Sequence, residues 1–162
     1  MNIEKNIKTL IVKKPLKLDC GKTIKDFPIA YETYGSLNSK KDNAILVFHA
    51  LTGDQFVTGI NPITKKEGWW SFAVGPGKAI DTDKYFVICS NVIGGCMGSY
   101  GPSHKDPVNN NIFGINFPVI TINDIVNAQY NLLEHFGIDK LFSIAGGSMG
   151  GMQVLQFISN FP

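Results

Sequence analysis

Short apolar runs bounded by turn-forming residues recur along the chain. Three of them are residues 44–50 (AILVFHA), 84–92 (KYFVICSNV) and 141–146 (LFSIAG). Each is continuous and brief, which is typical of parallel strands buried on both faces of a sheet. Residues 8–19 and 27–35 predict two further strands, joined by a turn around Gly21.

Two segments carry helical periodicity instead. The first runs from Thr121 through His135, with Thr121 and Asp124 in capping-box spacing and Gly137 as the stop signal. Its apolar positions are Ile122, Ile125, Val126, Leu132, Leu133 and Phe136. The second begins near Met149, and its apolar positions are Met152, Val154, Leu155 and Ile158. Alternating strands and helices predict an α/β fold with a mostly parallel sheet and flanking helices, built as a single domain over residues 1–162.

Composition narrows the functional classes. With 162 residues, 44% of them hydrophobic and 17% charged, the chain can bury a core of ordinary size. No apolar run is long enough for a membrane span or a signal peptide, so we expect a cytoplasmic protein without membrane contact. All fifteen basic residues are lysine, and the absence of arginine argues against nucleic acid as a partner. Cys20, Cys89 and Cys96 fit neither a disulfide framework nor a metal site and are expected to be reduced thiols.

The chemistry centres on Ser148. Residues 146–150 (GGSMG) fit the pattern G-x-S-x-G at the junction of a predicted strand and a predicted helix, which is the setting of a nucleophile elbow. The turn there is so sharp that glycine is needed at Gly146 and Gly150, while the serine hydroxyl is left exposed. A plain glycine-rich turn and a phosphate-binding loop are the alternatives. The second is the weaker of these, because the segment lacks both the G-x-G-x-x-G register and a Lys-Ser/Thr ending.

An earlier loop supports the elbow. Residues 49–54 (HALTGD) directly follow the apolar strand 44–50, where such an enzyme needs a second backbone N–H for the oxyanion. Leu51 is the expected donor from this loop. His49 is expected to anchor the loop through backbone hydrogen bonds rather than to act in catalysis.

Three segments together resemble a known family. HALTGD, the block from Gly68 to Ser103 (GWWSFAVGPGKAIDTDKYFVICSNVIGGCMGSYGPS) and GGSMGGMQ are similar, in this order and spacing, to the homoserine O-acyltransferases of the α/β-hydrolase superfamily. The resemblance extends over nearly the whole chain. It implies an acetyltransferase of methionine biosynthesis with Ser148 as the nucleophile and the amides of Leu51 and Met149 as the oxyanion hole. It also implies acetyl-CoA or succinyl-CoA and L-homoserine as substrates, no cofactor or metal, and a homodimer in the complete protein.

The chain departs from the family in two ways. Tyr100 stands in a loop where many members have threonine, so we expect a larger aromatic side chain near the site. Members are also about twice as long and carry the catalytic Asp and His after the nucleophile, whereas His49, His104 and His135 all precede Ser148. The sequence therefore resembles the N-terminal portion of the fold, truncated after the nucleophile helix, and we expect little turnover from it alone.

Two rival functions remain open at this level. A serine esterase of the same fold would use the same residues, with water as the acyl acceptor. A catalytically incomplete fragment, or half of a split enzyme, would need a C-terminal partner. Of the local histidines, His104 is the one whose loop could approach Ser148; Asp81 and Asp83 are expected to form a turn before a strand.

Overall fold

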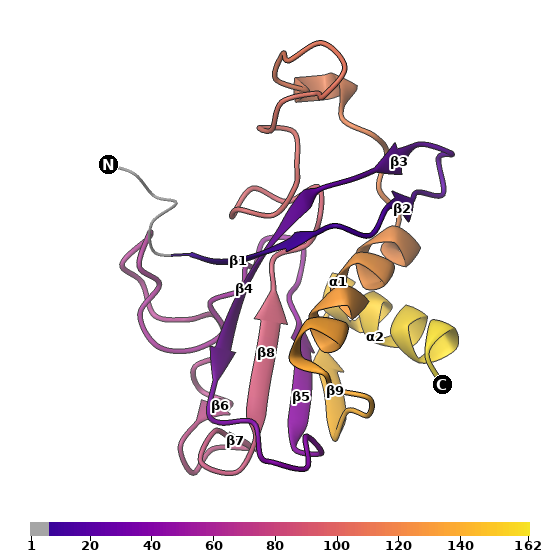
Figure 1. Ribbon diagram of the computed structural model, residues 1–162. Coiled ribbons are helices and arrows are strands. Elements are labelled where there is room, and N and C mark those ends of the chain that lie inside the picture. The colour runs from indigo at the N-terminus through magenta and orange to yellow at the C-terminus, as the bar shows by residue number, and fades with distance from the viewer. Residues whose placement is uncertain (1–6) are drawn as a thin grey trace.

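A five-stranded sheet organises residues 7–162, the part of the chain that the computed structural model describes (Figure 1). Its strands, in spatial order, are β1 (Lys8–Val12), β4 (Phe27–Tyr34), β8 (Phe86–Ser90), β5 (Ala44–Phe48) and β9 (Ser143–Gly146). β8, β5 and β9 pair in parallel, and β4 is antiparallel to both β8 and β1. Four of the five strands consequently point the same way, which confirms the predicted mostly parallel sheet.

The two faces of the sheet are covered by different parts of the chain. Helices α1 (Ile122–Phe136) and α2 (Met149–Asn160) lie together on one side of the sheet (Figure 1). Beneath them lie the side chains of Ala44, Leu46, Phe48, Phe86 and Ile88. The alternate positions Ile45, Val47, Val87 and Cys89 pack on the other side against Val57, Val74, Trp69 and Trp70. Because both faces are covered, β5 and β8 are buried at every position, as continuous apolar strands require.

Helix α1 has the ends that the sequence predicts. The Thr121 hydroxyl accepts a hydrogen bond from the Asp124 amide at 3.2 Å, and the Asp124 carboxylate accepts one from the Thr121 amide at 3.0 Å. Gly137 ends the helix in the left-handed conformation, with φ 64°. The capping box and the glycine stop are thus confirmed, and they fix where α1 lies against the sheet.

The prediction of one continuous strand over residues 8–19 is wrong. Pairing with β4 stops at Val12, and a separate two-stranded sheet follows, made of β2 (Leu16–Lys17) and β3 (Thr23–Ile24). Pro15 lies in the gap, where its missing N–H cannot continue a ladder. Between β3 and β4, Asp26 adopts a left-handed backbone conformation, with φ 49°.

Three short elements have no counterpart in the sequence prediction. They are β6 (Val74–Gly75), β7 (Ile80–Asp81) and the 3₁₀ helix η2 (Gly114–Asn116). The expected turn before β8 is present, because the Asp81 carboxylate accepts hydrogen bonds from the amides of Gly77 and Asp83, at 2.9 and 3.1 Å. Neither α1 nor α2, the two α-helices of residues 7–162, combines the length and apolar character that crossing a membrane requires.

The capping box provides a stability test. Replacing Thr121 by valine keeps the branched shape but removes the hydroxyl, which caps α1 and also donates to the exposed Asp19 carboxylate, so the free energy of unfolding should fall by about 1 kcal/mol or slightly more. Urea titration followed by circular dichroism measures it. Thr9→Val, on an exposed position of β1, is the matched control and should leave stability within about 0.5 kcal/mol of the parent. Equal stability of the two variants would contradict the role of the cap.

Candidate active site

Ser148 occupies a strained turn between a strand and a helix. β9 ends at Gly146 and α2 begins at Met149, and Ser148 between them has φ 56° and ψ −125°. Such a conformation costs a non-glycine residue roughly 1–3 kcal/mol, and it persists only where the surrounding structure holds it. The side chain is exposed and makes no capping hydrogen bond to α2, so its hydroxyl is available for chemistry. The predicted elbow geometry is confirmed.

The glycines on either side of Ser148 are required by backbone contacts. A Cβ atom on Gly146 would lie 2.6 Å from the carbonyl oxygen of Gly150, closer than real Cβ atoms come. A Cβ atom on Gly150 would overlap the carbonyl oxygen of Phe48, at the end of β5. The two positions therefore accept only hydrogen, as a turn this sharp requires.

The second contact brings the elbow against the loop that follows β5. In the parallel pairing of β5 and β9, Phe48 lies opposite Gly146, so both strands end at the same edge of the sheet. Leu51 follows three residues after Phe48 and is 76% exposed. The loop that contains the predicted donor Leu51 and the turn that contains Ser148 and Met149 thus emerge side by side.

The peptide group that carries the Leu51 amide is held from its carbonyl side. The carbonyl oxygen of Ala50 accepts a hydrogen bond from Nδ1 of His49 at 2.7 Å and from the amide of Gly53 at 2.9 Å. Because a trans peptide is planar, its N–H points away from its C=O. These two bonds therefore set the direction of the Leu51 N–H.

Both predicted donor amides are available. Within residues 7–162, neither the Leu51 amide nor the Met149 amide donates a hydrogen bond. Met149 is the first residue of α2, where the positive end of the helix dipole favours a developing negative charge. That the two amides converge on one point beside Ser148 remains a prediction.

His49 is buried and neutral, as an anchor should be. It is 1% exposed, and its Nε2 accepts a hydrogen bond from the Val92 amide at 3.2 Å while Nδ1 donates to Ala50. The acceptor role of Nε2 leaves the proton on Nδ1. Burial lowers the pKa of His49, although the hydrogen bond to the Ala50 carbonyl and the charge of Asp54 act the other way. With both ring nitrogens engaged, His49 is not free to serve as a base.

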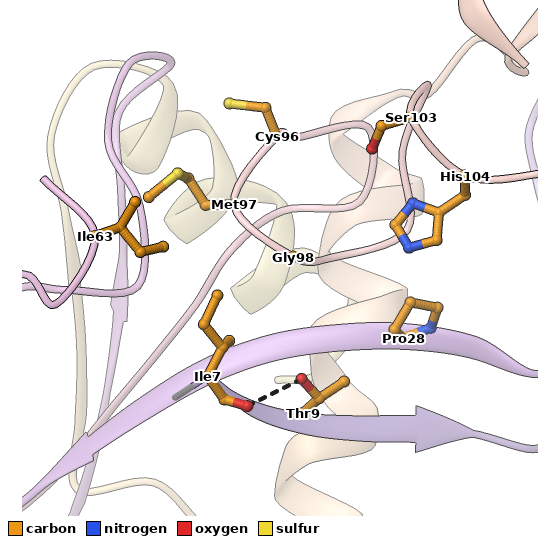
Figure 2. A pocket seen from close by; sticks show the side chains of 9 residues that line it. All are labelled: Ile7, Thr9, Pro28, Ile63, Cys96, Met97, Gly98, Ser103 and His104. Atoms are coloured by element: carbon orange, nitrogen blue, oxygen red, sulfur yellow. Dashed lines mark hydrogen bonds between the residues drawn. The ribbon is translucent and has the colours of Figure 1, made fainter. Parts of the chain in front are cut away.

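The other candidate residues lie elsewhere. Nδ1 of His104 accepts a hydrogen bond from the Gly101 amide at 3.2 Å, and the ring packs beside Tyr100. Figure 2 shows His104 in the wall of a cavity of about 480 Å³, and Ser148 is not among the described residues that line it. His135 is exposed near the end of α1, against the ring edges of Tyr31 and Phe136.

Tyr100, the larger aromatic residue noted in the sequence, is a core residue. It is 8% exposed, and its ring packs in the core against Phe27, Phe113 and Phe117. Its burial follows from the backbone, because the Tyr100 amide donates to the Pro28 carbonyl at 2.8 Å and fixes the loop against β4. Core packing therefore accounts for the larger aromatic side chain at this position.

Gln153 is a residue of the site that no sequence motif singled out. This side chain is fully buried beneath the elbow, and it donates a hydrogen bond to the carbonyl oxygen of His49 at 3.1 Å. Its position on the inner face of α2 follows from the spacing of the buried residues Gly150, Gln153 and Phe157. Met152, Leu155 and Ile158, which the apolar pattern singled out, are exposed instead. The sequence did hold one signal: Gln153 lies three residues after Gly150, a position that must be glycine, and this helical spacing places both residues on the same face of α2.

All three cysteines are unpaired in residues 7–162: Cys89 is buried, and Cys20 and Cys96 are exposed. Burial raises the pKa of the Cys89 thiol, so it stays protonated and serves as an apolar group. In the same residues no three His, Cys, Asp or Glu side chains gather as metal ligands.

Comparison with known proteins places this arrangement in a family. The chain belongs to the α/β-hydrolase fold family, which matches residues 43–162. Within that fold it is similar along its whole length to the homoserine O-acetyltransferase of Pelagibacter ubique, with 75% identity over 162 residues. The homoserine O-acetyltransferase of Nitrobacter hamburgensis is 62% identical over 149 residues, or 92% of this chain. The chain spans 44% and 37% of the lengths of these two relatives.

Solved structures agree on the fold. A homoserine O-acetyltransferase from Bacillus anthracis matches 97% of this chain and 43% of its own, with a TM-score of 0.86 and 34% identity. Esterase E22 matches 91% of this chain and 42% of its own, with a TM-score of 0.83 and 35% identity. The resemblance stated from the sequence is thereby confirmed, and the same architecture occurs in a transferase and in an esterase.

Two neighbouring glycines test the elbow. Gly150→Ala places a methyl group against the Phe48 carbonyl and should destabilise the chain by about 1–3 kcal/mol through overpacking. Gly151→Ala is the matched control, because its Cβ would meet only the Gly146 carbonyl oxygen at 3.6 Å, an ordinary contact. It should be neutral or add up to about 1 kcal/mol through helix propensity. Similar unfolding free energies for both variants would contradict the close contact between α2 and β5.

His49 gives stability a pH dependence with a defined sign. The unfolded chain protonates His49 near its ordinary pKa of 6.5, whereas the folded chain takes the proton only at lower pH. Below about pH 6.5 the unfolded state therefore binds more protons, and the free energy of unfolding falls as the pH drops. His49→Asn should flatten that slope. Urea titrations of both proteins from about pH 7.5 to about pH 5 measure it, and identical slopes would refute the assignment.

Proposed function

We propose that the protein carrying this chain moves an acetyl group from acetyl-CoA to the hydroxyl group of L-homoserine through an acetyl-Ser148 intermediate. The observation that carries the proposal is the 75% identity to a homoserine O-acetyltransferase over all 162 residues, together with a serine held on a strained turn between β9 and α2. The product would be an activated homoserine ester on the route to methionine.

The residues of this chain would act as the acyl-accepting half of the site. The Ser148 hydroxyl oxygen attacks the thioester carbonyl carbon as its proton passes to a base. The negative charge then develops on the carbonyl oxygen, which the amides of Leu51 and Met149 would stabilise; each such donor lowers the barrier by roughly 3–4 kcal/mol in comparable sites. Collapse of this intermediate breaks the carbon–sulfur bond and releases CoA, which takes the proton. The homoserine hydroxyl then attacks acetyl-Ser148 by the same steps.

The base would come from the portion of the longer relatives that this chain does not span. His49 has both nitrogens engaged, His104 lies at the wall of another cavity, and His135 is exposed on α1. In the superfamily the acid and the histidine follow the nucleophile in the chain. The acyl donor is proposed as acetyl-CoA because the similar proteins are named acetyltransferases; succinyl-CoA is the alternative.

An esterase of the same fold is the second candidate, favoured by the structural match to esterase E22. The two reactions share the acyl-enzyme and differ only in whether homoserine or water attacks it. The 75% identity to the Pelagibacter ubique transferase, against 35% to esterase E22, favours transfer. Homoserine would accelerate CoA release by a transferase and would leave acetate formation by an esterase unchanged.

The proposal is tested with a chimera in which residues 1–162 replace the matching segment of the Pelagibacter ubique relative. The chimera should release CoA thiol from acetyl-CoA in a homoserine-dependent reaction. Ser148→Ala should lower kcat by about 10⁴-fold or more, because the nucleophile is lost. Release of CoA that homoserine does not accelerate, with free acetate as product, would contradict transfer.

Residues 1–162 alone should show no turnover in the same assay. An unassisted serine hydroxyl is a weak nucleophile at neutral pH, so without a positioned base the rate should fall by several orders of magnitude. The purified chain is compared with its Ser148→Ala variant at equal concentration. Turnover near that of the chimera, abolished by Ser148→Ala, would mean that a histidine of this chain is the base.

A further inference from the structure

A buried hydrogen-bonded glutamine joins the two segments that carry the proposed oxyanion-hole amides. Gln153 is 0% exposed, and a primary amide in such a place is destabilising unless its groups are hydrogen-bonded. Its Nε2 donates to the carbonyl oxygens of His49 at 3.1 Å and of Met149 at 3.3 Å. Its Oε1 accepts from Nε2 of Gln129 at 3.1 Å.

The positions of these acceptors give Gln153 its significance. His49 is two residues before Leu51, and Met149 carries the other proposed donor. The two hydrogens of one –NH₂ group therefore bridge the end of β5 and the first turn of α2, which come from segments about 100 residues apart in sequence. A shift of α2 relative to the loop after β5 would break one of the two bonds.

The two carbonyl acceptors fix the orientation of the bridging amide, because a reversed Gln153 amide would place its oxygen against both carbonyl oxygens. Gln129 projects from α1, is 1% exposed, and donates to the oxygen of Gln153, while its own Oε1 has no hydrogen-bond partner among the described residues. Gln129 thus extends the bridge to α1, the helix fixed by its capping box.

We propose that Gln153 is a positioning residue that holds the amides of Leu51 and Met149 at the separation needed to bind the oxyanion, with Gln129 linking its side chain to α1. The inference rests on the proposed acyl chemistry at Ser148. Removing one oxyanion-hole donor costs about 10²- to 10³-fold in kcat in comparable enzymes, and a displacement of about 1 Å can cost about 10²-fold. Loss of the bridge should accordingly lower kcat more than it affects substrate binding.

The test compares three variants of the chimera. Gln153→Met keeps the size of the side chain but removes both bonds, and kcat per folded enzyme should fall by about 10- to 100-fold, with the KM for acetyl-CoA changed less than about threefold. Gln156→Met, one turn along α2, is the control, because Gln156 bonds only to Asn160 on its own helix. It should keep kcat within about twofold of the parent.

Gln153→Glu separates positioning from simple structural support. A protonated carboxyl group has one O–H, which can restore the bond to the His49 carbonyl but not the second bond to Met149, and it accepts through its C=O; the carboxylate faces the His49 carbonyl without a donor. Burial raises the pKa of such a carboxyl group towards neutrality. The kcat of Gln153→Glu relative to that of the parent should therefore rise as the pH is lowered from about 8 to about 6.

The outcomes are distinguishable from failure of the proposed function. Each variant is also assayed with p-nitrophenyl acetate and water, because the same oxyanion hole would serve either acceptor. If homoserine does not accelerate CoA release, the transferase proposal fails. The Gln153 variants can then still be compared through their hydrolysis of p-nitrophenyl acetate. Gln153→Met with parental kcat and a lowered melting temperature, or Gln153→Glu with a pH-independent ratio, would overturn the positioning role. Should Gln153→Met not fold, the Gln153→Glu ratio decides.

Discussion

The contact between the backbone of Gly150 and the carbonyl group of Phe48 is the constraint on which the rest of the site depends. It places the first turn of α2 directly against the end of β5, so a loop that follows one strand and a turn that follows another meet at one edge of the sheet. Any side chain at position 150 would force the two apart. This single approach places the turn that exposes Ser148 beside the loop that contains Leu51.

Holding that contact requires rigid supports on several sides. Ser148 has an unfavourable conformation, which packing of β5, β9 and α2 must maintain. On the loop side, His49 joins β5 to the segment after β8 through the Val92 amide and orients the Ala50 carbonyl. On the helix side, Gln153 and Gln129 link α2, the loop and α1. Each of these polar groups is buried, where a satisfied hydrogen bond is most orienting and an unsatisfied one most costly.

The elements whose local and tertiary signals agree were predictable from sequence. The strands at residues 44–48 and 86–90 are recognisable as continuous apolar runs, and α1 has capping residues at both of its ends. Ser148 was predictable because glycine spacing and the change from strand to helix coincide. The Leu51 loop was predictable only by its position after a buried strand.

Other features depend on tertiary packing that no local pattern specifies. Helix α2 turns Gln153 inward and Leu155 outward, because the close approach at Gly150 sets its rotation before hydrophobicity does. Tyr100 is buried because its backbone pairs with Pro28, a residue 72 positions earlier. The strand predicted over residues 8–19 breaks near Pro15, where tertiary pairing stops. These are cases in which tertiary context outweighs local propensity.

The central claim is that the loop after β5 and the first turn of α2 together form one oxyanion hole beside Ser148. The most direct test is a crystal structure of the chimera with Ser148 phosphonylated by a serine-directed phosphonate, whose phosphoryl oxygen stands in for the oxyanion. The account predicts that this oxygen accepts hydrogen bonds of about 3 Å from the amides of both Leu51 and Met149. A phosphoryl oxygen that faces other donors, or a Leu51 amide turned away with the Ala50 carbonyl in its place, would contradict it.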